Sequence, residues 1–122
     1  MSVPELPDAP GPITIPLSTE VRKAYQELYD TIEAAIETTK DAAVLESLNA
    51  RQADVDNVLT KDDMYRLHAN TALFDALLRQ VNDTNESLAT LQKQISSIAA
   101  GFNEAGQVLA AINKVLSLVP GI

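Results

Sequence analysis

The longest pattern in the chain is an apolar repeat every seven residues, which extends from Leu67 to Val119. With Leu67 as position a of the heptad, six of the eight d positions are apolar, the exceptions being Asn70 and Thr84. Heptads sustained over this length favour helices that pack as a coiled coil. We call the a and d positions the seam. All eight a positions are apolar: Leu67, Phe74, Val81, Leu88, Ile95, Phe102, Leu109 and Leu116.

An earlier amphipathic stretch precedes this repeat. Ser18 or Thr19 can accept the N-cap hydrogen bond of a helix, and apolar residues then recur at steps of three or four. These residues are Val21, Tyr25, Leu28, Ile32 and Ile36, followed after an Ala-rich interval by Leu45, Leu48, Val55 and Leu59. Thr60 and Asp63 resemble a capping box, which indicates a new helix start. The sequence therefore predicts a helix over about 19–58, a turn over about 59–62 and a second helix over about 62–118.

The expected fold class is all-α, as a long antiparallel helical hairpin or coiled-coil bundle. An alternative is a three-helix bundle in which the second helix breaks near residues 82–86. This segment, Asn-Asp-Thr-Asn-Glu, consists largely of poor helix formers. The uninterrupted heptad phase favours the continuous helix, because a turn has no reason to preserve register.

The two ends of the chain differ from the middle in composition. Five of the six prolines lie within residues 1–16, which predicts an extended N-terminal arm over 1–17. No proline occurs between Leu17 and Val119, so a helical domain is expected over 18–119, followed by a tail over 120–122.

The net charge of −8 argues against nucleic acid as a partner, because a phosphate-binding surface needs clustered Lys and Arg. Residues 1–60 carry a net charge of −7 and residues 61–122 a net charge of −1. The N-terminus has neither the basic region nor the apolar region of a secretory signal peptide. We expect a cytoplasmic location, and the sequence leaves export without a cleaved signal peptide open.

We find no combination of residues that points to catalysis. The chain has no Cys, and its only histidine, His68, has Met64 and Ala72 at the helical i−4 and i+4 positions. That spacing offers no metal pair and no base for a nucleophile. No phosphate-binding or dinucleotide-binding glycine motif occurs. We therefore expect no enzyme activity, no catalytic residue, no cofactor, no metal and no small-molecule substrate.

The C-terminal part of the seam suggests a protein partner. If the chain turns at 59–62, the second helix extends beyond the first and exposes a wide apolar surface, which is more than a soluble monomer usually tolerates. We expect a second copy of the chain or a helical partner to dock there through coiled-coil packing. The predicted partner-binding residues are Phe102, Ala105, Gly106, Val108, Leu109, Ile112, Val115, Leu116 and Val119.

The alternative function is a protein that associates with a lipid or membrane surface, including a secreted helical hairpin. Residues 87–122 carry only Lys93, Glu104 and Lys114 as charges. An interfacial helix usually has a strongly basic polar face. The polar face here consists of Asn, Gln and Ser, so the sequence favours a function in protein interaction over one at a lipid surface.

Overall fold

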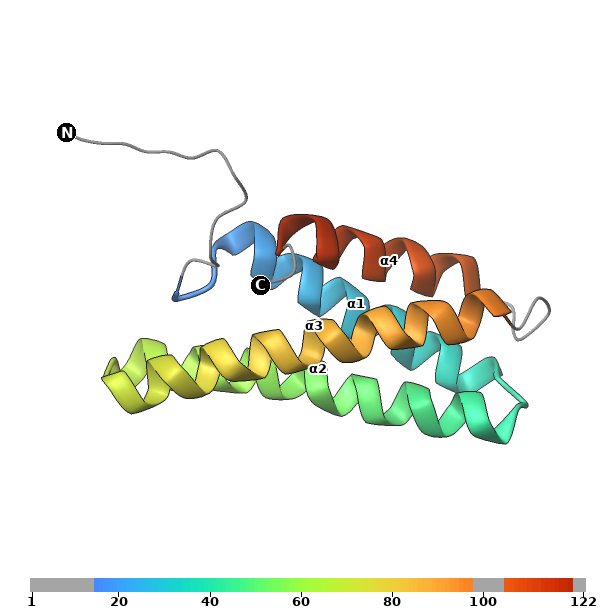
Figure 1. Cartoon of the computed structure of the whole chain (residues 1–122), viewed down its shortest axis with the longest axis horizontal. Helices are drawn as coiled ribbons and strands as arrows, with labels where there is room; N and C mark the ends of the chain where they lie inside the picture. Colours follow the sequence, from blue (N-terminus) through green and yellow to red (C-terminus); the bar gives the residue numbers. More distant parts are fainter. Residues whose placement is uncertain (1–14, 98–104, 120–122) are drawn as a thin grey trace.

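The protein is all-helical, and its helices pack as a bundle (Figure 1). The computed structural model describes residues 15–97 and 105–119. Within these ranges each helix lies between two neighbours: α1 and α3 both pack against α2 and against α4. Twenty-one buried hydrophobic residues, contributed by all four helices and by Leu17, form one core cluster. The helices are α1 (Thr19–Thr38), α2 (Ala42–His68), α3 (Thr71–Ser97) and α4 (Ala105–Leu118).

The start of α1 lies where the sequence predicts it. The Ser18 hydroxyl accepts a hydrogen bond from the Val21 backbone N–H at 3.2 Å, which makes Ser18 the N-cap. Tyr25, Leu28 and Ile32 then turn one continuous face into the core and are fully buried.

The first helix is shorter than predicted, because the chain reverses at residues 39–41. The Asp41 carboxylate accepts a hydrogen bond from the Val44 N–H at 3.0 Å and caps α2. The predicted turn at 59–62 is wrong, since α2 continues through it to His68. Thr60 and Asp63 lie within α2 and start no new helix, and Asp62 lies between them. Its side chain is buried and is already paired with arginines of α1 and α2.

The helix α3 is continuous through residues 82–86, so the predicted alternative with a break in this segment is wrong. The poor helix formers Thr84 and Asn85 are buried there and hydrogen-bonded to other helices. The heptad register is correct over this helix, where the buried seam residues are Leu77, Val81, Thr84, Leu88, Leu91 and Ile95. Phe74, which we expected to be buried, is 36% exposed.

A single helix over 62–118 is also wrong, because the chain forms α3 and α4, which lie side by side in the bundle. The buried residues of α4 are Val108, Ile112 and Val115, followed by Val119 just past its end. Successive buried residues are four, three and four positions apart, as in a heptad repeat. This repeat is out of phase with the heptad that continues from α3. The apolar repeat predicted helical packing correctly and the number of helices incorrectly.

The helices differ in length, and this shapes one end of the molecule. The turn between α2 and α3 extends past the start of α1 (left-hand end of Figure 1, yellow-green). We call residues 63–76, which form the last turns of α2, the connection and the first turns of α3, the tip. Asp62 is level with the chain entering α1, because it accepts the Leu17 N–H at 2.9 Å.

Candidate interaction surfaces

The residues predicted to bind a partner divide into two groups in the structure. Val108, Ile112, Val115 and Val119 face the core of the chain's own bundle. Burial of one aliphatic side chain contributes about 1.5–3 kcal/mol, so these four hold α4 in place without a second chain. The projecting overhang expected from the sequence is therefore wrong.

The second group lies at the margin of α4. Leu109, Leu116 and Ala105 are partly buried against the core, and Gly106 is exposed. Phe102 lies outside the described residues. Docking of a second chain on the margin of α4 remains a prediction.

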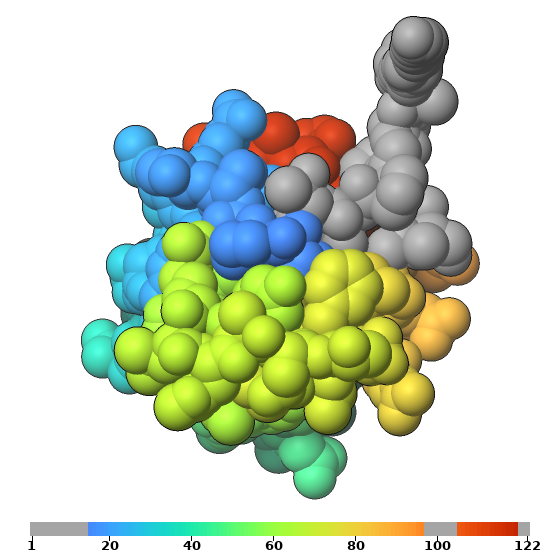
Figure 2. Space-filling view, turned by 90° about the vertical axis from the view of Figure 1, so that its left-hand side faces the viewer, coloured from blue at the N-terminus to red at the C-terminus, as the bar shows by residue number. Residues whose placement is uncertain are grey.

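The described residues expose three large apolar side chains, and all three lie at the tip. Leu67 is 77% exposed, Met64 43% and Phe74 36%. Figure 2 looks onto this end, where the connection between α2 and α3 lies beneath the chain that enters α1. A single exposed leucine is ordinary, whereas the gathering of all three around one turn is informative. We call Met64, Leu67 and Phe74 the tip patch.

The position of each tip-patch residue follows from helix geometry. Leu67 comes five residues after the buried Asp62, which places it about 140° around α2 from the core. Met64 is three residues before Leu67 and shares its outward face. Phe74 is in the seam register of α3, but it lies in the first turn of that helix. Its ring contacts Tyr65 edge-on, with centroids 6.0 Å apart.

The connection at the tip is strained at one residue. Ala69, the C-cap of α2, has φ 20° and ψ 82°, a region that residues with a Cβ rarely adopt. Asn70 next to it is the N-cap of α3, because its side-chain oxygen accepts the Leu73 N–H at 2.9 Å. Asn70 is exposed and is not a seam residue, contrary to the sequence register. Local backbone strain of this kind often occurs at functional sites.

We expect Ala69→Gly to stabilise the fold by about 0.5–1 kcal/mol, because glycine adopts positive φ without a steric penalty. Ala53→Gly, at an exposed site within α2, is the matched control and should destabilise by about 1 kcal/mol. Urea unfolding followed by circular dichroism measures both. A loss of stability in Ala69→Gly equal to that in Ala53→Gly would contradict strain at the connection.

A buried carboxylate anchors the base of the tip. The Asp62 side chain has no exposed surface and accepts hydrogen bonds from Arg22 Nη1 at 2.6 Å and Arg66 Nε at 2.8 Å. It also accepts the Leu17 N–H, while Arg66 Nη2 donates to the Leu17 carbonyl at 2.5 Å. Arg22 Nη2 pairs in turn with Asp63 at 2.8 Å. These contacts fix the chain before α1 and the last turns of α2 as one unit, so the tip has a rigid base.

A second buried polar contact crosses the middle of the bundle. The Tyr25 hydroxyl on α1 donates to Asn85 Oδ1 on α3 at 2.7 Å. Asn85 Nδ2 donates to the Val119 carbonyl at 3.2 Å, just past the end of α4. Thr84, the seam residue before it, donates to the Asp54 carbonyl at 3.4 Å. Buried polar groups of this kind specify how helices pair, since a wrong alignment leaves them without partners.

Tyr25 should make the protein sensitive to alkali. Burial raises the pKa of its phenol well above the ordinary value, and the hydrogen bond to Asn85 opposes the shift only in part. The stability that the neutral phenol contributes is full below the unfolded-state pKa of about 10 and falls as pH rises above it. Tyr25→Phe should lose about 1–2 kcal/mol at pH 7, because Asn85 loses a partner.

The difference in absorbance at 295 nm between wild type and Tyr25→Phe isolates the Tyr25 phenolate. This signal should rise only as the helical circular dichroism signal is lost. A Tyr25 phenolate that forms near pH 10 in a fully helical protein would contradict the burial.

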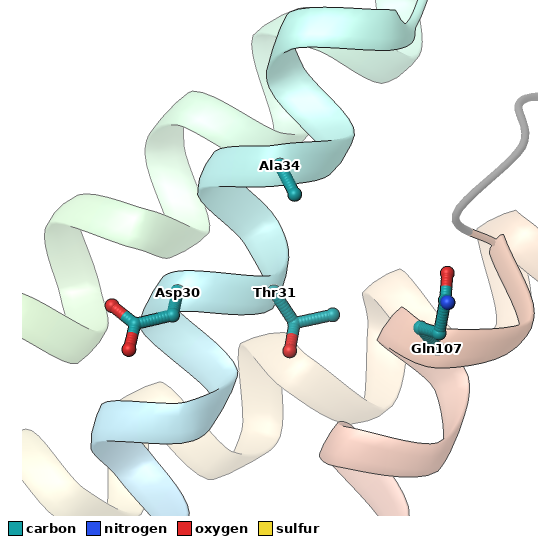
Figure 3. Close-up of a pocket in the computed structure, with 4 residues that line it drawn as sticks. All are labelled: Asp30, Thr31, Ala34 and Gln107. Atoms are coloured by element: carbon teal, nitrogen blue, oxygen red, sulfur yellow. The ribbon is translucent and has the colours of Figure 1, made fainter.

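A groove between α1 and α4 has no catalytic combination of side chains. It has a volume of about 280 Å³ and is lined by Asp30, Thr31 and Ala34 of α1 and by Gln107 of α4 (Figure 3). Thr31 and Ala34 point toward the α4 side, whereas the Asp30 carboxylate points away from Gln107. The groove thus offers a hydroxyl, a methyl group and an amide, and none of its lining residues points a base toward the hydroxyl to activate it.

Two further features bear on function. Within residues 15–97 and 105–119, no three His, Cys, Asp or Glu side chains come together as metal ligands, and His68 is exposed. Over the same ranges no helix combines the length and apolar character needed to span a bilayer.

The chain matches no protein-family model, no curated protein and no solved structure.

Proposed function

We propose that the protein is a non-catalytic helical module that holds another protein chain, either a second copy of itself or a helical partner, through coiled-coil packing. The observation that carries the proposal is the tip patch. Three large apolar side chains are exposed at one end of the bundle, whereas the other large apolar side chains of the described residues are buried or partly buried. Exposed apolar side chains that gather in one place often mark an interaction surface.

The rest of the described structure supports a role in binding rather than chemistry. The polar residues Asp62, Thr84 and Asn85 are buried, and each is hydrogen-bonded within the bundle. They position helices, and no pair of them faces a cavity where a substrate could react. A rigid body with a fixed apolar end suits docking, since little conformational entropy is then lost on binding.

Sedimentation velocity of the full chain, from about 1 to about 200 µM, tests this function, because small interfaces give weak complexes. We expect a reversible rise in mean mass with concentration, or one stoichiometric partner in the purified protein. A chain that stays monomeric throughout this range and carries no partner contradicts the proposal.

A further inference from the structure

We infer that the tip patch is the contact between two copies of this chain, joined tip to tip about a twofold axis. This inference rests on the proposed function and adds to it the surface and the partner. Three observations carry it: the exposed apolar side chains, the charges around them and the number of helices at the tip.

The first observation is the arrangement of the apolar side chains. Met64 and Leu67 form one ridge on the outward face of α2, and Phe74 lies across the connection on α3. Two side chains three positions apart on one helix form a ridge that fits the groove on the surface of another helix. In a twofold contact the same surface serves both molecules, so the ridge of each copy meets the helices of the other.

The second observation is charge. Residues 61–79 hold three basic residues and three acidic residues, so the whole net charge of −8 resides elsewhere. Two copies repel each other little where this segment, which carries no net charge, meets its own counterpart. Asp75 and Arg79 are exposed, and their opposite signs allow the acidic group of one copy to face the basic group of the other. The charged residues of the segment are Lys61, Asp62, Asp63, Arg66, Asp75 and Arg79.

The same charges argue against other occupants. A basic protein would be attracted to the acidic surface of α1, where Glu27, Asp30 and Glu33 are exposed, rather than to a neutral end. An anionic membrane would repel a chain of this net charge.

The third observation is the helix count. In the body of the bundle each helix has two neighbours, but of the residues that the structure describes only those of α2, α3 and their connection extend beyond Asp62 (Figure 1). Two helices alone cannot enclose a core, which is why Phe74 is exposed although Val81, Leu88 and Ile95 in the same register are buried. Two tips packed together supply four helix ends and restore that enclosure.

Sedimentation velocity on full-length variants tests the surface. Leu67→Glu adds one negative charge at the tip, and Ala110→Glu adds the same charge at an exposed site on α4. Both should melt like wild type, because both side chains are exposed. We expect Leu67→Glu to weaken dimerisation at least tenfold and Ala110→Glu to leave it unchanged.

The outcomes separate this inference from the proposed function. If Ala110→Glu abolishes association and Leu67→Glu does not, the contact is on α4. The tip-to-tip contact is then wrong, whereas the proposed function stands. If wild type is monomeric but dimerises after removal of residues 1–14, the arm covers the tip and the inference fails. It also fails if wild type stays monomeric and pellets with phosphatidylserine vesicles in a Leu67-dependent manner, because the tip would then bind lipid.

Discussion

Ile95→Asp should reduce the free energy of unfolding by about 4 kcal/mol or more, because it removes a buried aliphatic side chain and places an unpaired carboxylate in the core. Ile95 is 3% exposed and lies in the seam of α3 between α2 and α4. Small domains have only about 5–15 kcal/mol of stability, so this variant should be partly unfolded without denaturant.

Ser96→Asp is the matched control, since it introduces the same charge one residue away at an exposed position. It should change stability by less than about 0.5 kcal/mol. Urea unfolding of both variants, extrapolated linearly to zero denaturant, measures the difference. If the two midpoints agree, Ile95 is not in the core and the register of α3 is wrong.

Removing both arginines that contact Asp62 should destabilise the protein by about 3–5 kcal/mol, because a buried carboxylate then lacks a counter-charge. Arg22→Ala alone leaves Arg66 in contact with Asp62, and Arg66→Ala alone leaves Arg22. Each single variant should therefore lose only about 1–2 kcal/mol. The double variant should lose more than the sum of the two.

Two controls accompany the arginine variants. When Asp62→Asn is added to the double variant Arg22→Ala, Arg66→Ala, we expect about 2 kcal/mol of the lost stability to return, because the buried charge is removed. Arg51→Ala removes the partner of Asp54 in a more exposed ion pair and should cost less than about 1 kcal/mol. The anchoring role of Asp62 would be wrong if the double arginine variant lost only the sum of the two single losses of stability and if Asp62→Asn restored none of it.

The sequence predicted those features that depend on local chemistry and periodicity. Ser18 begins α1, as its hydroxyl and the following apolar residues indicate. The seam of α3 is buried from Leu77 to Ile95, including the polar Thr84. Both follow from patterns that a helix repeats within a few turns.

The chain reversals were missed because their capping residues have other plausible roles. Asp41 caps α2, although it also fits the acidic surface of a longer helix. Asn70 falls on a d position, where asparagine often fixes register, yet it caps α3. The heptad phase continues numerically from α3 into α4. This concealed the fact that Val108 and Val115, rather than Leu109 and Leu116, are buried beside Ile112 and Val119.

The tip patch was missed for a related reason. Leu67 fits position a only if it belongs to the same helix as Phe74, whereas it lies on α2 and faces outward. The Asp62 contacts join residues 40 and 45 positions apart, and no local pattern encodes such a separation. The spacing of Asp62 and Arg66, four residues apart, was the one signal in the sequence for part of that cluster.

The tip-to-tip contact is tested most directly by distances between spin labels, because the chain has no cysteine and accepts single labelling sites. Ala72→Cys places a label at the tip, and Lys40→Cys places one at the opposite end of α2. Pulsed electron paramagnetic resonance at dimerising concentrations should give about 20–30 Å between Ala72 labels, close to two helix diameters. Lys40 labels should lie about 80 Å apart, twice the length of α2. A short distance between Lys40 labels, with none between Ala72 labels, would contradict the contact.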